Sequence, residues 1–278
     1  MQTYHFTKMQ AAGNDYIYFD CTCEGVPDPA AAARRLSDRH FGVGGDGIVL
    51  ILPSQRADFR MRMFNADGSE AQMCGNAIRC VGKYIHDRGL SKKNPLTVET
   101  LAGIKTLELT VESGAVARVR VDMGLPQLDA PKIPMALPSG EAVGVPVCAA
   151  GRGFILDGVS MGNPHGVIFG QDPDKEDVGH IGPALETHAL FPEHANIEFV
   201  QVLDETHLKV RVWERGSGET LACGTGACAA AVAAVRRGYC RMDAEIAVEM
   251  RGGTLGVRYD GRRVWLSGGA EFVFDGSC

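Results

Sequence analysis

Two cysteines in this chain are placed where a thiol could act as an acid or a base. Cys74 and Cys223 each follow polar or turn-forming residues, and each leads through a glycine into an apolar, helix-prone stretch. Each is therefore predicted to lie at the N-terminus of a helix, a location that lowers the pKa of a thiol and favours negative charge. One such thiol in each half of the chain predicts an acid/base pair that faces a substrate across a cleft.

The residues beside the two cysteines help to distinguish a chemical role from a structural one. A cysteine considered alone is more often a buried structural residue. Gly75 and Asn76, however, have no obvious packing role, and they suit a loop whose backbone N–H groups bind an anion. The glycines before Cys223 could indicate a phosphate-binding loop, but no lysine follows them as it does in a P-loop. The pattern therefore favours thiol chemistry over nucleotide binding.

Two further loops carry polar side chains. The segment Gly162-Asn163-Pro164-His165 predicts a tight turn after a strand, where side chains tend to be displayed. Asn14 lies in a loop between two predicted strands. The remaining cysteines are expected to be structural, because their spacing does not supply the four ligands of a zinc site.

The composition indicates a globular protein with more than one domain. The 278 residues suit two domains of roughly 130–140 residues each. The formal charge of −6 argues against a protein that follows nucleic-acid phosphates. Neither a secretory signal nor a membrane-spanning stretch is recognisable. Nine cysteines in no familiar disulfide framework favour a reduced, cytoplasmic setting.

The elements that must position these residues are many short strands and a few helices. Helices are expected over residues 30–39, 74–89, 178–188 and 223–237. The short spacing between strands predicts no room for crossover helices, so the sheets are expected to be mostly antiparallel. The proline-rich residues 125–144 are the predicted linker, which gives domains 1–125 and 126–278. The expected class is α+β, with two similar domains that each wrap a mostly antiparallel sheet around a central helix.

Taken together, these motifs resemble the diaminopimelate epimerase family. The resemblance covers essentially the whole chain. None of the motifs is specific to this family alone, but their order and spacing together are. The pieces are Lys8-Met9, Gly13-Asn14-Asp15, Gly42-Val43-Gly44 with Asp46-Gly47, Asn65–Cys80, Gly162–His165, Asn196 and Glu214–Gly226. The resemblance implies a cofactor-independent isomerase, without a metal, that converts LL-diaminopimelate to meso-diaminopimelate in a cleft between two domains.

The resemblance also implies a role for each candidate residue. Cys74 and Cys223 are the catalytic thiolate and thiol, and they exchange roles with the direction of the reaction. His165 and Glu214 tune the protonation of the thiols. The residues implied to bind the substrate, through backbone N–H groups or side chains, are Asn14, Asn65, Gly75, Asn76, Asn163, Asn196, Glu214, Arg215, Gly224 and Thr225.

Other reactions on the same fold are the nearest alternatives: a proline, hydroxyproline or histidine racemase, or a phenazine-type isomerase. Glu214-Arg215 ahead of the second Cys-Gly, together with Asn65 and Asn196, favours diaminopimelate. A thiol–disulfide or metal-binding module would require a close Cys-x-x-Cys pair, which this chain lacks. A binding protein with inert cysteines would not exchange the α-proton of any amino acid.

The resemblance implies a small-molecule substrate, no nucleic-acid or membrane partner, and a cytoplasmic location. A homodimer is compatible with it, as is a place in the synthesis of lysine or of cell-wall precursors. One departure is Gly47, which stands where some members carry glutamine. A side-chain contact with the substrate is therefore expected to be missing at this position.

Overall fold

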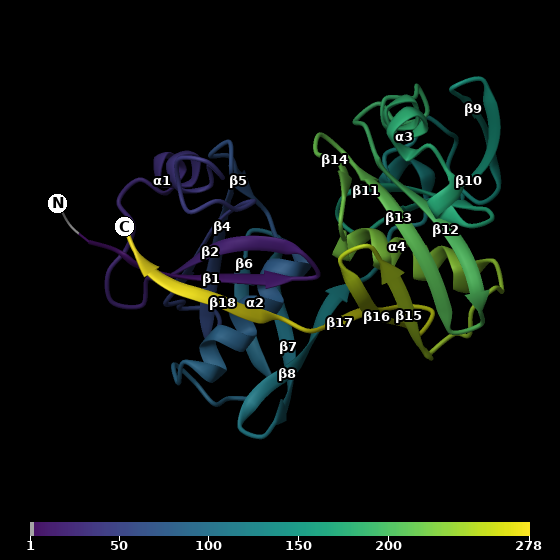
Figure 1. Ribbon diagram of the computed structural model, residues 1–278. Coiled ribbons are helices and arrows are strands. Elements are labelled where there is room, and N and C mark those ends of the chain that lie inside the picture. Colours follow the sequence, from purple (N-terminus) through teal and green to yellow (C-terminus); the bar gives the residue numbers. More distant parts are fainter. Residues whose placement is uncertain (1–2) are drawn as a thin grey trace. The chain divides into compact units, whose positions relative to one another are not determined.

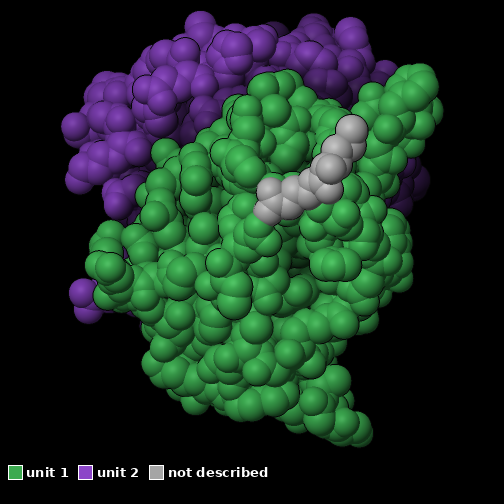
Figure 2. Space-filling model, turned by 90° about the vertical axis from the view of Figure 1, so that its left-hand side faces the viewer, with its two compact units in different colours: residues 1–122, 267–278 green, residues 123–266 purple. Residues whose placement is uncertain are grey.

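A computed structural model of the chain describes residues 3–278, and its contacts divide the chain into two compact units. Unit 1 consists of Met1–Asp122 and Ser267–Cys278, and unit 2 of Met123–Leu266, coloured separately in Figure 2. The proposed domain boundary at residue 125 differs little from the first limit of unit 2. The last residues differ from the predicted domains, because they belong to the contacts of unit 1.

Unit 1 is built on one curved sheet with two helices (Figure 1). Its strands are β1 (His5–Ala11), β2 (Asn14–Asp20), β3 (Gly47–Leu52), β4 (Phe59–Asn65), β5 (Glu70–Ala71), β6 (Leu96–Thr100), β7 (Gly103–Glu112), β8 (Ala115–Gly124) and β18 (Glu271–Ser277). Its helices are α1 (Pro29–Leu36) and α2 (Gly75–Asp87).

Unit 2 repeats this plan. Its strands are β9 (Val145–Ala149), β10 (Arg152–Ser160), β11 (Pro164–Phe169), β12 (Asn196–Asp204), β13 (His207–Glu214), β14 (Gly218–Thr220), β15 (Glu245–Met250), β16 (Gly253–Tyr259) and β17 (Val264–Gly268). Its α-helices are α3 (Val178–Glu186) and α4 (Gly224–Arg236), and short 3-10 turns occur at Ala130–Lys132 and Pro173–Lys175.

The strand pairing shows that the two units are copies of one topology. In unit 1 the pairs β18–β1, β1–β2, β3–β4, β4–β5 and β6–β7 are antiparallel, while β2–β3 and β4–β6 are parallel. In unit 2 the pairs β9–β10, β10–β11, β12–β13, β13–β14 and β15–β16 are antiparallel, while β11–β12 and β13–β15 are parallel. The C-terminal strand β18 therefore completes unit 1 at the place that β9 occupies in unit 2.

The expectation of mostly antiparallel sheets is confirmed, but the reason given for it is wrong. Each of the four helices α1–α4 lies in the connection between two parallel strands, as in a βαβ unit. The spacing between these strand pairs includes a helix of 8 to 13 residues, which is enough for a crossover.

The sheets wrap around α2 and α4. Helix α2 contacts β1 and β2 and also β7, which lies several strands away in the same sheet. Helix α4 contacts β10, β11 and β12 on one side and β15 and β16 on the other. Every residue of α2 from Gly75 to His86 is buried, and α4 is buried apart from Thr225 and Arg236. The central helices are therefore core elements, and their first turns have fixed surroundings.

The predicted linker is not an exposed connection. Ala130, Ile133, Met135 and Ala142 from this segment are buried in the core cluster of unit 2, beside Phe154 and other apolar residues. The prolines and glycines interrupt the hydrophobic periodicity of this segment, but its apolar residues still pack into the core. Within residues 3–278, no helix is long and apolar enough to cross a membrane.

Candidate functional site

Cys74 is the N-cap residue of α2. Its backbone is extended (φ −133°, ψ 126°), and its carbonyl accepts the first intrahelical hydrogen bond from the N–H of Ile78 at 3.0 Å. The short strand β5 and the turn after β4 bring the chain to this point. The predicted location of Cys74 at a helix N-terminus is correct.

A chain of polar side chains fixes the surroundings of Cys74. The Cys74 thiol donates to Asn14 Oδ1 over 3.4 Å, and Asn14 Nδ2 donates to Asp46 Oδ2 over 2.6 Å. Arg39 joins Asp46 to Asp15, with N–O distances of 3.0 and 2.7 Å. Because Asp46 holds the amide nitrogen of Asn14, the amide oxygen is left facing the sulfur.

A buried lysine completes this network. Lys8 Nζ lies 2.7 Å from Asp15 Oδ2 and also donates to the carbonyl of Gly44. Burial raises the pKa of Asp15, but hydrogen bonds from Arg39 and Lys8 outweigh it and hold the pKa below its ordinary value. Asp15 therefore stays ionised and anchors the loop that carries Asp46.

The first turn of α2 is braced from inside by Arg79, whose side chain is fully buried. Arg79 Nη1 donates to the carbonyl of Gly75 and Nη2 to Asn76 Oδ1, each over 3.0 Å. The side chain of Asn76 is thus turned into the core and is only 2 % exposed. Asn65 lies at the end of β4, where its amide donates to Ser69 Oγ over 3.0 Å.

Cys223 occupies the same position on α4. It is the N-cap, with extended backbone (φ −115°, ψ 116°), and its sulfur accepts from the N–H of Gly226 at 3.4 Å. Thr225 Oγ1 lies 3.4 Å from the same sulfur, and Asn163 Nδ2 donates to Thr225 Oγ1 over 3.3 Å. The structure therefore brings Cys223, Thr225 and Asn163 together.

His165 connects this group to the core. His165 is two residues after Asn163 in the sequence, and its Nε2 lies 3.2 Å from Asn163 Oδ1. Its Nδ1 lies 2.7 Å from Glu198 Oε1, and both side chains are 0 % exposed. The expectation that His165 is displayed in a turn is wrong, because Pro164 already starts β11 and turns the ring inward.

Two carboxylates act on the Cys223 thiol. Burial raises the pKa of Cys223 well above its ordinary value, and the charges of Glu214 and Glu198 add to the rise. Burial also raises the pKa of Glu214, against the lowering effect of hydrogen bonds from Thr220 and Cys223. The prediction that a helix N-terminus lowers the pKa of this thiol is therefore wrong for Cys223, because the desolvation and the two carboxylates are larger effects.

Asn196 and Arg215 form a separate contact where β12 begins and β13 ends. Asn196 Nδ2 donates to the carbonyl of Pro164 over 3.1 Å, and its Oδ1 accepts from the backbone N–H of Arg215 over 2.9 Å. The guanidinium of Arg215 is exposed and donates to the carbonyl of Glu193. Asn196 is therefore a brace for the Arg215 loop, while the Arg215 side chain is displayed.

Gly47 is explained by packing. A Cβ at this position would lie 2.0 Å from the carbonyl oxygen of Phe64, because β3 begins here between β2 and β4. This backbone leaves no space for any side chain, and the missing substrate contact at this position stays a prediction.

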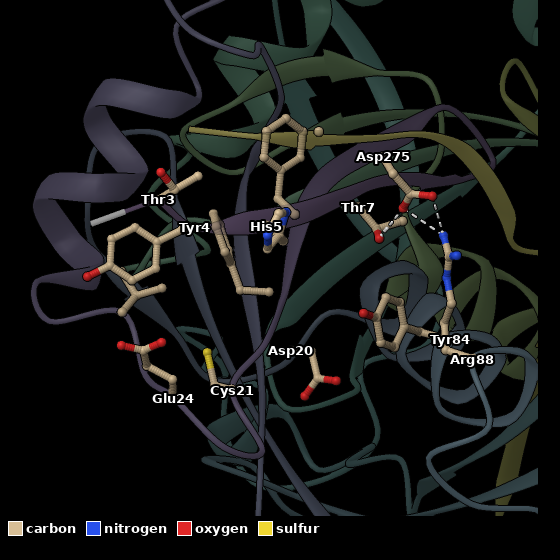
Figure 3. A pocket seen from close by; sticks show the side chains of 14 residues that line it. Thr3, Tyr4, His5, Thr7, Asp20, Cys21, Glu24, Tyr84, Arg88 and Asp275 are labelled. Carbon is tan, nitrogen blue, oxygen red and sulfur yellow. Dashed lines mark hydrogen bonds and ion pairs between the residues drawn. The ribbon is translucent and has the colours of Figure 1, made fainter. Parts of the chain in front are cut away.

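A cavity of about 410 Å³ in unit 1 lies away from these residues. It is lined by parts of β1, β2 and β18 and by Tyr84 and Arg88 near the end of α2 (Figure 3). Arg88 pairs with Asp275 at 2.6 Å, and Asp275 also accepts from Thr7. This is the C-terminal end of α2, where the helix dipole disfavours a carboxylate, and Cys74 lies at the opposite end.

Three residues of the site escaped the sequence reasoning: Asp46, Arg79 and Glu198. Asp46 belongs to the Asp46-Gly47 motif, but its role in orienting Asn14 depends on a contact between distant segments. Glu198 interrupts the otherwise apolar run Ile197-Glu198-Phe199-Val200 of β12, and a charge inside such a strand is a usable signal. Among residues 3–278, no three potential metal-binding side chains are grouped.

The duplicated topology of the two units is a fold that this chain shares with solved structures of other proteins. A phenazine biosynthesis protein of the PhzF family from Bacillus anthracis matches with a TM-score of 0.73 at 20% identity, over 100% of this chain and 99% of that one. A hydroxyproline epimerase from Agrobacterium vitis matches with a TM-score of 0.68 at 13% identity, over 100% and 91%. Identities this low show the shared fold alone.

Sequence comparison identifies the family within that fold. The model of the family described as diaminopimelate epimerase matches residues 6–128 and 158–272. Proteins named diaminopimelate epimerase are 54% identical in Acetivibrio thermocellus, over 98% of this chain and 97% of the relative, and 52% identical in Desulfovibrio desulfuricans, over 98% and 96%. The chain belongs to the diaminopimelate epimerase family.

Proposed function

We propose that this protein epimerises LL-diaminopimelate to meso-diaminopimelate, with Cys74 and Cys223 as its acid/base pair and no added cofactor. The observation that carries this proposal is the repeated placement of a cysteine at the N-cap of a buried central helix, in a chain of this family. Two such thiols are the minimum that a two-sided proton exchange requires.

The reaction balances with protein groups alone. The thiolate of one cysteine takes the α-proton: the Cα–H bond breaks, an S–H bond forms, and the electron pair spreads onto the α-carboxylate. The thiol of the other cysteine then gives its proton to the opposite face of the carbon. The configuration is inverted, and the two cysteines have exchanged protonation states.

Charge that develops on the α-carboxylate needs hydrogen-bond donors. The first N–H groups of a helix have no intrahelical acceptors, and we assign those of Gly75, Asn76, Gly224 and Thr225 to the carboxylate. The intrahelical bonds begin only at Ile78 and Ala227, which supports this assignment.

We assign the rest of the substrate to the polar side chains around the two cysteines. Asn14 faces Cys74, and Asn163 reaches Thr225 beside Cys223. The exposed guanidinium of Arg215 suits bidentate capture of the distal carboxylate. Asn65, Asn196 and Glu214 complete the proposed set, with Asn196 acting through the Arg215 loop and Glu214 and His165 acting on the Cys223 thiol.

The biological setting follows from this proposal as a set of expectations. The partner is a small-molecule substrate, with neither nucleic acid nor membrane involved. We expect a cytoplasmic homodimer whose product serves lysine synthesis, cell-wall synthesis or both.

The test is proton exchange in heavy water. The reduced protein is incubated with LL-diaminopimelate without added cofactor, the α-proton is followed by NMR, and the stereoisomers are separated by chiral chromatography. Deuterium at one α-carbon together with meso product is the expected result. The Cys148→Ser variant, which changes an exposed cysteine outside the site, is the matched control and should behave like the parent.

Other amino acids distinguish the alternatives. Exchange with proline, hydroxyproline or histidine, but not with diaminopimelate, would keep the two-thiol mechanism and overturn the substrate. The absence of exchange with every amino acid would overturn the epimerase assignment itself.

A further inference from the structure

Glu198 is the most deeply buried carboxylate near the site, and nothing in the family resemblance gives it a role. It lies on β12 between Val167 and Val212 of the neighbouring strands and is 0 % exposed. Its Oε1 lies 2.7 Å from His165 Nδ1, while its Oε2 has no hydrogen-bond partner among residues 3–278. Burying a half-satisfied carboxylate costs free energy, so its presence requires an explanation.

The position of Glu198 relative to α4 supplies one. A Cβ built on Gly226 would lie 2.6 Å from Glu198 Oε1, so the carboxylate rests directly against the first turn of the helix. The N–H of that same Gly226 donates to Cys223 Sγ. Glu198 therefore lies against the backbone group that contacts the sulfur, and only glycine leaves it the space.

The first turn of α4 and the buried carboxylate have opposite effects on the protonation of the Cys223 thiol. The N–H of Gly226 and the helix dipole favour the thiolate. A carboxylate buried at the same turn disfavours it, because like charges repel strongly where water is excluded.

We propose that Glu198 is a positioning residue that keeps Cys223 in its thiol form, ready to donate a proton, by holding a negative charge against the first turn of α4. His165 locks the carboxylate in this place from β11. This role deepens the epimerisation proposed above and depends on it for its catalytic meaning.

Two other titratable side chains, Glu214 and His165, belong to the surroundings of Cys223. Glu214 on β13 adds a second carboxylate, and His165 connects Glu198 to Asn163 and Thr225 by side-chain contacts. Burial raises the pKa of Cys223, with Glu214 next and Glu198 third among the causes. Glu198 differs from Glu214 in being fully buried and in having an oxygen without a hydrogen-bond partner among the described residues.

The experiment is a pH titration of the full-length protein labelled with ¹³C at the cysteine Cβ. The Cys223 resonance is identified by its absence from the Cys223→Ser variant. In the parent protein, we expect its midpoint to lie above the ordinary thiol value of about 8.5. In Glu198→Gln, which keeps the shape and removes the charge, we expect the midpoint to fall by about one unit.

Kinetics provide the second readout. The alkaline limb of kcat/KM against pH reports loss of the proton from the essential acid. In Glu198→Gln this limb should move to lower pH by the same amount as the NMR midpoint. A residue with only a structural role would lower the rate without moving the limb.

The matched control is Asp157→Asn. Asp157 is also a buried carboxylate of unit 2, but it pairs with Arg237 at the opposite end of α4. This variant should leave the Cys223 midpoint at the parent value. If Glu198→Gln does not fold, Glu198→Asp retains the charge and should keep the midpoint within about half a unit of the parent.

Two results would overturn the role of Glu198: a parent midpoint at or below the ordinary thiol value, or an unchanged or higher midpoint in Glu198→Gln. Neither result depends on turnover. A failure of the proposed function would instead appear as absent deuterium exchange in the parent, so the two failures are distinguishable.

Discussion

The first turns of α2 and α4 share a Cys-Gly sequence and an N-cap geometry, yet their cores carry opposite charges. Beneath the first turn of α2 lies the buried guanidinium of Arg79, which donates to Gly75 and Asn76. Beneath the first turn of α4, the place of Arg79 is taken by Cys228, and the buried charge is the carboxylate of Glu198. A cation thus supports one cysteine turn and an anion the other.

This difference shows how a duplicated fold can supply an acid and a base. An identical pair of cysteine turns would give both thiols the same preference for a proton. Different surroundings are the general way in which paired titratable groups acquire separate roles. We infer that Cys223 is the resting acid, which leaves the role of the resting base to Cys74 in the proposed mechanism.

The largest expected effect comes from joining the two sulfurs. The proposed mechanism requires both sulfurs to reach one α-carbon, so mild oxidation is expected to form a Cys74–Cys223 disulfide and abolish activity, and a reducing agent should restore it. Peptide mapping by mass spectrometry identifies the bond, and the exposed Cys148 reports unspecific oxidation. Full activity in protein with this bond confirmed would rule out the two-thiol mechanism.

Single replacements test the two turns separately. Cys74→Ser and Cys223→Ser should each lower kcat by a factor of about 10²–10⁴, because a hydroxyl is a far poorer acid or base at neutral pH. Circular dichroism and thermal unfolding should match those of the parent. Normal turnover in either variant would show that the assignment of that cysteine is wrong.

The buried cation beneath α2 is tested by Arg79→Leu. This change removes the guanidinium that donates to the carbonyl of Gly75 and to the amide oxygen of Asn76, so the free energy of unfolding should fall by about 2–4 kcal/mol. Urea denaturation measures the loss. The kcat/KM of the folded fraction should also fall, because the first turn that carries Cys74 loses its brace.

Lys83→Met is the control for this effect. Lys83 is buried in the same helix, where it donates to Val116 and pairs with Asp87 at 3.1 Å, two turns from Cys74 along the chain. It should lower stability and leave the kcat/KM of the folded fraction unchanged. Equal kinetics in Arg79→Leu and the parent would mean that Arg79 serves stability alone.

The chain's chemistry could be predicted from its sequence more fully than its packing. Cys74 and Cys223 were identifiable because a turn-forming segment, a glycine and an apolar run define a helix start in the local sequence. The direction of the pKa shift of Cys223 could not be predicted, because the shift is caused first by burial of the thiol and then by the charges of Glu214 and Glu198. Glu198 lies 25 residues upstream, and only the pairing of β12 beside β11 brings it to the thiol.

The errors in the prediction of the fold have a similar origin. The helices and most strands followed from periodicity, but parallel pairing and the position of β18 depend on contacts between distant segments. Residues His5 and Ser277, nearly the whole chain apart, are partners in the sheet of unit 1. The buried Ile133 in the proline-rich segment was missed because one apolar residue among turn formers has no detectable period.

An effect smaller than these losses of activity and stability is expected at Glu214, the carboxylate that shares the Cys223 environment with Glu198. Its charge raises the pKa of the Cys223 thiol, after burial and ahead of Glu198. Glu214→Gln should therefore lower that pKa, so that the thiol loses its proton at lower pH and the alkaline limb of kcat/KM moves to lower pH by up to about one unit. Glutamine can still accept the hydrogen bond from Thr220, so the loop should remain in place.

Glu219→Gln is the matched control, because Glu219 lies on the same hairpin but pairs with Arg211 at 2.7 Å. Its pH profile should coincide with that of the parent. An alkaline limb that stays in place in Glu214→Gln, while it moves in Glu198→Gln, would assign control of the Cys223 proton to the fully buried carboxylate alone. Movement in both variants would show that the acid turn, unlike the turn of Cys74, is set by a pair of anions.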